Sequence, residues 1–112
     1  MTMKNMEVIS IVNNYNAGKF DKSVPVPFEF AQKLTRNINT LEMELGTITP
    51  LVDELNRKLA DGEITQEEYS QEFYELRMTE RSVDVLTCSR SILDGVEVTM
   101  DMMSVIYFMF ED

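Results

Sequence analysis

The most regular hydrophobic pattern in the chain follows a pair of prolines. Apolar residues recur at alternating intervals of three and four from residue 31 to residue 59, namely Ala31, Leu34, Ile38, Leu41, Leu45, Ile48, Val52, Leu55 and Leu59. This a/d heptad spacing predicts one long helix, and Pro27 is suited to its first turn. The apolar seam can serve as a coiled-coil interface with a second copy, or as an amphipathic face packed on its own chain.

Gly46 and Pro50 interrupt the long helical pattern. Proline inside a helix lacks an N–H donor and clashes with the carbonyl four residues back, which here belongs to Gly46. The helix therefore either kinks, or stops and restarts with Thr49 as cap and Pro50 as first residue. The unbroken heptad phase favours the kink, because a true break need not preserve the register.

A second helix is predicted to pack on the first. Residues 60–63 form a turn, and Thr65 with Glu68 three residues later makes a capping box. One face of this second helix is apolar, with Tyr69, Phe73 and Leu76. A short connection between helices implies an antiparallel hairpin, so we predict that residues 27–60 pack against residues 65–80.

Shorter elements are predicted on both sides of this hairpin. Residues 6–17 suit a short helix capped by Asn5. Residues 83–98 read as irregular or short β structure, with candidate strands at 83–86 and 96–98. From Thr99 onward the spacing of Met100, Met103, Tyr107 and Phe110 suits a last helix, whereas the β-branched and aromatic residues of this segment leave a strand as the alternative. Residues 1–112 are therefore expected to form a single, mainly α domain, built on a kinked hairpin with a possible small β element.

Composition argues against several kinds of function. The chain has 112 residues, one cysteine and no histidine. Lack of histidine removes the commonest general base and the commonest metal ligand. Near Cys88 the sequence offers no general base and no basic cluster beyond Arg90, so nucleophilic catalysis is not expected. The methionines near the C-terminus (Met100, Met102, Met103 and Met109) are expected to fill the core. We therefore expect no enzyme, no catalytic residue, no metal site and no cofactor.

Residues 61–69 resemble the second half of a calcium-binding EF-hand loop. Arg57 and Leu59 stand where the first two carboxylates of such a loop belong, so calcium binding is not expected. The longest apolar run, residues 105–110, is far shorter than the roughly 20 residues that a membrane span needs. With no signal peptide recognisable, the expected location is the cytoplasm.

Negative charge is concentrated in the second half of the chain. The formal net charge is −10; residues 1–60 carry seven acids and seven bases, whereas residues 61–112 carry thirteen acids and three bases. Such a surface repels phosphate backbones, so direct binding of nucleic acid is not expected. It attracts a basic protein surface, although acids also serve simply to keep a small protein soluble.

Four stretches of the chain carry a resemblance to a family. Residues 9–15, 24–38 and 41–45 and the ending 107–112 are similar to small uncharacterised proteins encoded by phages and prophages of Gram-positive bacteria. In those proteins a short helix leads through a proline connector into a long helix. Gly46 and Pro50 are a departure from that pattern. The resemblance implies a phage setting and the host bacterial cytoplasm, and carries no activity.

Two functional hypotheses follow from these observations. In the first, the protein inhibits a host nucleic-acid enzyme or a defence effector such as a CRISPR nuclease, by mimicking nucleic acid. The contact residues would be five carboxylates, Glu63, Glu67, Glu68, Glu72 and Glu75, standing in for phosphates. In the second, the protein is a structural or assembly component for phage morphogenesis and forms a homodimer through the heptad helix.

Overall fold

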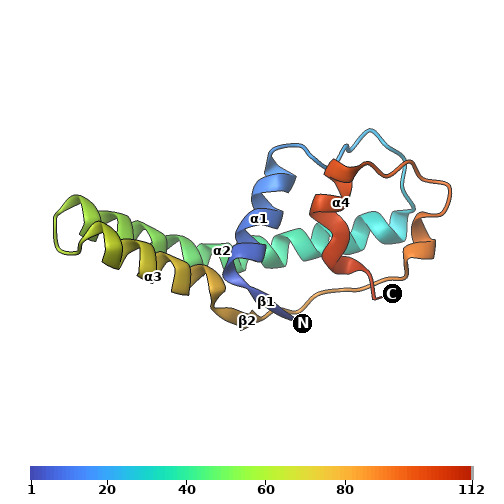
Figure 1. Cartoon of the computed structure of the whole chain (residues 1–112). Coiled ribbons are helices and arrows are strands. Elements are labelled where there is room, and N and C mark those ends of the chain that lie inside the picture. Colours follow the sequence, from blue (N-terminus) through green and yellow to red (C-terminus); the bar gives the residue numbers. More distant parts are fainter. Residues whose placement is uncertain (112) are drawn as a thin grey trace.

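The computed structural model describes residues 1–111 and is mainly helical (Figure 1). The described part contains four α-helices: α1 (Asn5–Asn16), α2 (Phe28–Ala60), α3 (Gln66–Met78) and α4 (Met100–Ile106). Strands β1 (Thr2–Lys4) and β2 (Glu80–Ser82) pair antiparallel, and the 3-10 turns η1 (Arg90–Leu93) and η2 (Tyr107–Met109) flank α4 in sequence. The predicted fold class, mainly α with a small β element, is confirmed.

Helix α2 is the spine of the molecule. Helices α1 and α3 pack on it directly, and α4 packs on α1. Figure 1 shows α3 running back along the C-terminal half of α2, on the far side of α1 from α4. The predicted antiparallel helical hairpin is therefore present.

The long helix runs through Gly46 and Pro50 without a break. The alternative of a stop and restart at Thr49 is wrong, because the Thr49 hydroxyl donates to the Leu45 carbonyl at 3.0 Å instead of capping a new helix. Gly46 and Pro50 are both exposed, so water can reach the Gly46 carbonyl, which receives no N–H from Pro50. The helix can therefore continue through Pro50.

The heptad face of α2 is covered by the protein's own elements. Leu34, Ile38, Leu41 and Ile48 are buried, and the other five heptad residues are half-buried. Leu45 and Val52 are among the side chains that pack against the buried core. The amphipathic interpretation of the pattern is confirmed, and the seam that a coiled-coil dimer would use is occupied within the chain.

The buried core lies in one part of the molecule. Its apolar side chains come from β1, α1, the connector before α2, α2 as far as Ile48, and the chain after β2. Between Thr49 and Ser82 no residue is buried. We call residues 49–78 the arm and the rest of the described chain the head. The arm projects from the head, which gives the molecule its extents of 54 × 25 × 19 Å (Figure 1).

The chain re-enters the head through strand β2, which the sequence pattern did not predict. Met3 lies opposite Arg81 in the two-stranded sheet. No strand forms at 83–86 or 96–98, so that expectation is wrong, although Val83 exchanges two backbone hydrogen bonds with Met1 at the end of the two-stranded sheet. Instead the buried Asn37 amide donates to the Leu86 carbonyl and accepts from the Leu86 N–H, each at 2.8 Å. One side chain thus satisfies backbone groups that a neighbouring strand would otherwise pair, and the irregular structure predicted here is confirmed apart from η1.

Asn5 does not cap α1, contrary to the prediction. Lys4 occupies the cap position, and Asn5 is the first helical residue, with only 1% of its surface exposed. The Lys4 backbone N–H donates to the Glu7 carboxylate at 3.1 Å, which satisfies a donor at the start of the helix. The Asn5 side chain is therefore available for contacts with distant parts of the chain.

The last helix begins at the predicted cap but turns a different face inward. The Thr99 hydroxyl accepts from the Met102 N–H at 3.1 Å. Met102, Val105, Ile106 and Met109 are buried, whereas Met100 is 91% exposed and Tyr107 is 45% exposed. Both sets of residues have helical spacing, and the segment is apolar on most sides, so periodicity alone could not select the buried face. The expectation that methionines fill the core holds for Met102 and Met109 and is wrong for Met100.

Candidate functional site

The acidic helix α3 begins where its sequence predicts. Gly62 takes a left-handed backbone conformation, with φ of 72°, and so turns the chain after α2. The Thr65 hydroxyl accepts from the Glu68 N–H, and the Glu68 carboxylate accepts from the Thr65 N–H, each at 3.1 Å. This capping box satisfies two donors at the start of α3. Glu67 and Glu68 also lie in the first turn, where the helix dipole favours negative charge.

One side of α3 is apolar and holds the helix on α2. Tyr69, Phe73 and Leu76 are half-buried, and the rings of Tyr69 and Phe73 stack with centroids 5.7 Å apart. The Tyr69 hydroxyl donates to the Asn56 side-chain oxygen on α2 at 2.7 Å. The predicted inward face is therefore correct. Because the arm is a layer of only two helices, none of the residues on this face is fully buried.

The opposite side of α3 presents four of the five predicted contact residues together. Glu67, Glu68, Glu72 and Glu75 line one shallow hollow with Gln71, and all four are exposed. We call these four carboxylates the acidic strip. Within it, the Gln71 amide donates to the Glu75 carboxylate at 2.9 Å. The one base of α3, Arg77, lies over the Phe73 ring at 5.4 Å from its centroid, on the other face of the helix.

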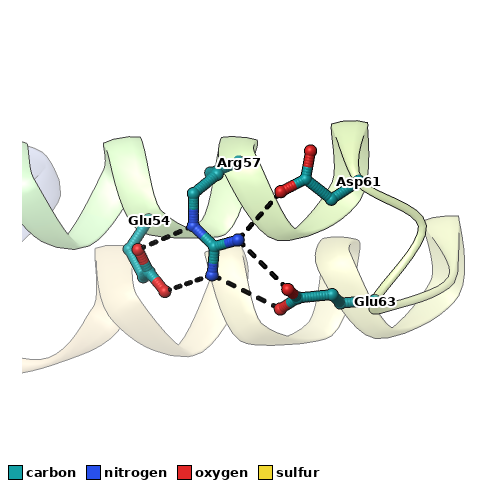
Figure 2. A network of polar contacts seen from close by, with 4 residues as sticks. All are labelled: Glu54, Arg57, Asp61 and Glu63. Atoms are coloured by element: carbon teal, nitrogen blue, oxygen red, sulfur yellow. Dashed lines mark hydrogen bonds and ion pairs between the residues drawn. The ribbon is translucent and has the colours of Figure 1, made fainter.

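Glu63, the fifth predicted contact residue, belongs to a separate cluster at the tip of the arm. Figure 2 shows Arg57 between Glu54, Asp61 and Glu63. Its guanidinium donates to Glu54 at 2.7 and 3.1 Å, to Asp61 at 2.9 Å, and to Glu63 at 3.1 and 3.3 Å. The hydrogen bonds from Arg57 lower the pKa of Glu54. The charge of Glu63 is thus shared with a cation, and Glu63 does not join the acidic strip.

The same cluster bears on the rejected calcium site. Arg57 stands where a loop carboxylate would be needed, and it neutralises the acids of the turn instead of adding to them. Within residues 1–111 no group of three or more acidic, cysteine or histidine side chains is arranged to hold a metal ion. The turn is therefore a hairpin tip that ion pairs hold together.

A second polar cluster joins the arm to the head, and sequence reasoning missed it. Arg81 donates to the Glu44 carboxylate at 2.6 Å, to the Thr47 hydroxyl at 2.7 Å and to the Asn5 side-chain oxygen at 2.7 Å. The Asn5 amide donates to the Leu76 carbonyl at 2.8 Å, and the Asn5 backbone N–H donates to the Thr79 carbonyl at 2.9 Å. These contacts tie the end of α3 and strand β2 to α1 and α2. The only sequence signal for this cluster is an asparagine at the start of a helix, and that pattern equally predicts an N-cap.

Comparisons with known proteins add no relative. No protein-family model, curated protein or solved structure matches the chain. The resemblance to phage and prophage proteins therefore stays a prediction. Within the described residues, no helix has both the length and the apolar character to cross a membrane.

Proposed function

We propose that the protein acts by binding a basic protein surface through the acidic strip of α3. The observation that carries this proposal is the placement of four exposed carboxylates on one side of a projecting arm, with the nearest base turned to the other side. The arm as a whole has eight acids and three bases, a net charge of −5. An exposed, uncompensated charge of this kind steers an oppositely charged partner and speeds the encounter.

The partner class that we propose is a host enzyme with a groove for nucleic acid, including a CRISPR nuclease or another defence effector. Such grooves are basic because they hold phosphates. Eight residue steps separate Glu67 from Glu75, which is about 12 Å along a helix. A DNA duplex carries roughly seven phosphates over that length, at one charge per ~1.7 Å. The acidic strip therefore imitates a short stretch of backbone with about half its charge density, and we expect it to occupy part of a groove.

Displacement of DNA tests this proposal. Purified bacterial nucleases, with a CRISPR effector among them, are loaded with labelled duplex DNA, and the protein is titrated in. We expect it to release DNA from at least one enzyme, because the acidic strip and the phosphates compete for the same basic groove. If it releases DNA from none of them, the mimicry proposal is wrong.

Charge reversal locates the contact. The double variant Glu67→Lys and Glu72→Lys should lose the displacement, whereas Glu42→Lys with Glu97→Lys changes the net charge equally on exposed residues of the head and should retain it. Glu68 is left intact because it belongs to the capping box, so that α3 keeps its start. Equal displacement by the two double variants would show that the acidic strip is ordinary solvated surface.

A further inference from the structure

The hydrophobic core stops partway along α2. Ile48 is the last buried residue of this helix, and the next buried residue in the chain is Val83. A segment with no buried side chain opens at a lower free energy than the core does. The position of the arm therefore depends on its attachment at Ile48 and at β2 and on the packing of α3 against α1.

The arm is tied together internally. The Arg57 cluster crosses its tip, the capping box fixes the start of α3, and the hydrogen bond from Tyr69 to Asn56 joins the two helices. These contacts all lie within residues 49–78. They hold the two helices to each other, and the arm meets the head where α3 packs on α1. The arm can move as one piece once that packing is released.

The weakest part of α2 coincides with the end of the core. Pro50 gives no N–H to the Gly46 carbonyl, and Gly46 is the least restrained residue of the helix. The Thr47 hydroxyl donates to the Glu44 carbonyl at 2.7 Å and the Thr49 hydroxyl to that of Leu45 at 3.0 Å. Side-chain bonds of this type compete with the helical ladder and promote bending. Residues 46–50 thus combine several features of a hinge.

Packing at the base of the arm leaves room for movement. A hollow of about 250 Å³ is lined by residues of α1, α2 and α3, mainly apolar, among them Ile9, Leu45 and Phe73. Phe73 is only half-buried against it. The apolar contact at this point is therefore incomplete.

Arg81 positions the contact between the head and the end of α3. It follows the arm in the chain, and it reaches back to Glu44 and Thr47, directly before and within the weak part of α2. The same guanidinium holds Asn5, which binds the carbonyls of Leu76 and Thr79 at the end of α3. Of these contacts, only the hydrogen bond from the Asn5 amide to the Leu76 carbonyl joins the head to the arm. A swing of the arm has to break it, and Arg81 holds the Asn5 side chain in position to make it.

We propose that the arm is a hinged unit that swings about residues 46–50, and that the hydrogen bond from the Asn5 amide to the Leu76 carbonyl is the latch that holds it in place. Arg81, which is itself bound to Glu44 and Thr47, positions Asn5 for this bond. The latch is separate from the acidic strip. Its test requires no binding partner, so the outcome is independent of the proposed function.

Distance measurement by pulsed electron paramagnetic resonance tests the hinge. Spin labels are placed at exposed Gln66→Cys near the tip and exposed Lys19→Cys on the head, in a Cys88→Ala background. We expect one narrow distance distribution in the otherwise unchanged chain. Arg81→Ala should add a second distance while helical circular dichroism is retained. Adding Gly46→Ala and Pro50→Ala to Arg81→Ala should remove the second distance, because these changes restore an uninterrupted helix.

Milder and matched variants separate the latch from general destabilisation. Thr47→Val removes one of the contacts that position Arg81 and should give a smaller second population than Arg81→Ala does. Arg36→Ala, at an exposed arginine of the head, should give none. The proposal is overturned if Arg81→Ala leaves the distribution unchanged, or if the hinge replacements leave the second distance in place. It is also overturned if Arg81→Ala unfolds head and arm together, because the arm would then have no motion of its own.

Discussion

Burial decides what the two paired arginines contribute. The Arg57 side chain is 46% exposed and its three acidic partners are about half exposed, whereas Arg81 and Glu44 are 20% and 31% exposed. Exposed ion pairs contribute little free energy because water screens them. Removing Arg81 leaves the almost fully buried Asn5 oxygen without this donor, and a buried polar group that loses its partner is costly. Arg57 therefore shapes the tip, and Arg81 matters for how the chain is held together.

Two glycines should respond to alanine in opposite directions. Gly46 is helical and an added methyl group meets nothing within 4 Å, so Gly46→Ala should stabilise the protein by about 0.5–1 kcal/mol through helix propensity. Gly62 has a φ of 72°, so Gly62→Ala should destabilise by about 1–2 kcal/mol. Chemical denaturation of both variants measures these changes. A loss of stability in Gly46→Ala would contradict the continuous helix at this position.

Tyr107 links stability to alkaline pH. Partial burial raises its pKa above the ordinary value of 10.0, as do the charge of Glu7 and the hydrogen bond that the hydroxyl donates to that carboxylate at 3.4 Å. The folded state therefore holds this proton more tightly than the unfolded chain. The resulting stability is fully present below about pH 10, the ordinary tyrosine pKa, and is lost as the pH rises through the folded pKa. Denaturation midpoints between pH 9 and pH 11, as an approximate window, should fall less steeply in Tyr107→Phe than in the unchanged protein.

At the scale of elements, α3 is a helix held by one half-buried face. Phe73→Ala should lower the free energy of unfolding by about 1–3 kcal/mol, less than the 3–5 kcal/mol of a fully buried phenylalanine, because the ring already contacts water. In hydrogen exchange, the amides of the arm should lose protection before those of the head do. An equal loss throughout the chain would mean that the arm is no separate unit.

The elements that sequence could predict are those specified by neighbouring residues. The heptad of α2, the capping box at Thr65 and the turn at Gly62 are all local signals, and they gave the hairpin. The spacing of Glu68, Glu72 and Glu75 likewise gave the acidic strip, because residues three and four apart share a helix face. These features can be predicted without knowing the rest of the fold.

The features that sequence missed depend on residues far apart in the chain. Asn37 pairs with the backbone of Leu86, and Asn5 with Arg81, across 49 and 76 positions. The pairing of β1 with β2 is equally remote, and both strands have only three residues. Glu63 was grouped with the acidic strip because nothing in the spacing shows that Arg57 reaches across the turn to it. Such contacts become visible only once the helices are placed.

At the scale of the whole molecule, we expect a monomer. Four of the nine heptad residues are buried and the other five are half-buried in the single chain, so much of the surface that a coiled coil needs is already covered. Light scattering across a dilution series should give the mass of one chain, 13.0 kDa. A stable dimer that is disrupted by Leu41→Asp without loss of the monomer fold would restore the assembly hypothesis.

The salt dependence of binding tests the central claim, that the acidic strip is the contact surface. The affinity for an enzyme identified by DNA displacement is measured over a series of salt concentrations, for the unchanged protein and for the two charge-reversed double variants. Affinity should fall as salt rises, because salt screens exposed charges. The variant with lysines at 67 and 72 should bind weakly with a much flatter salt dependence, and the variant with lysines at 42 and 97 should keep the original slope. Equal slopes for the two variants would contradict the claim.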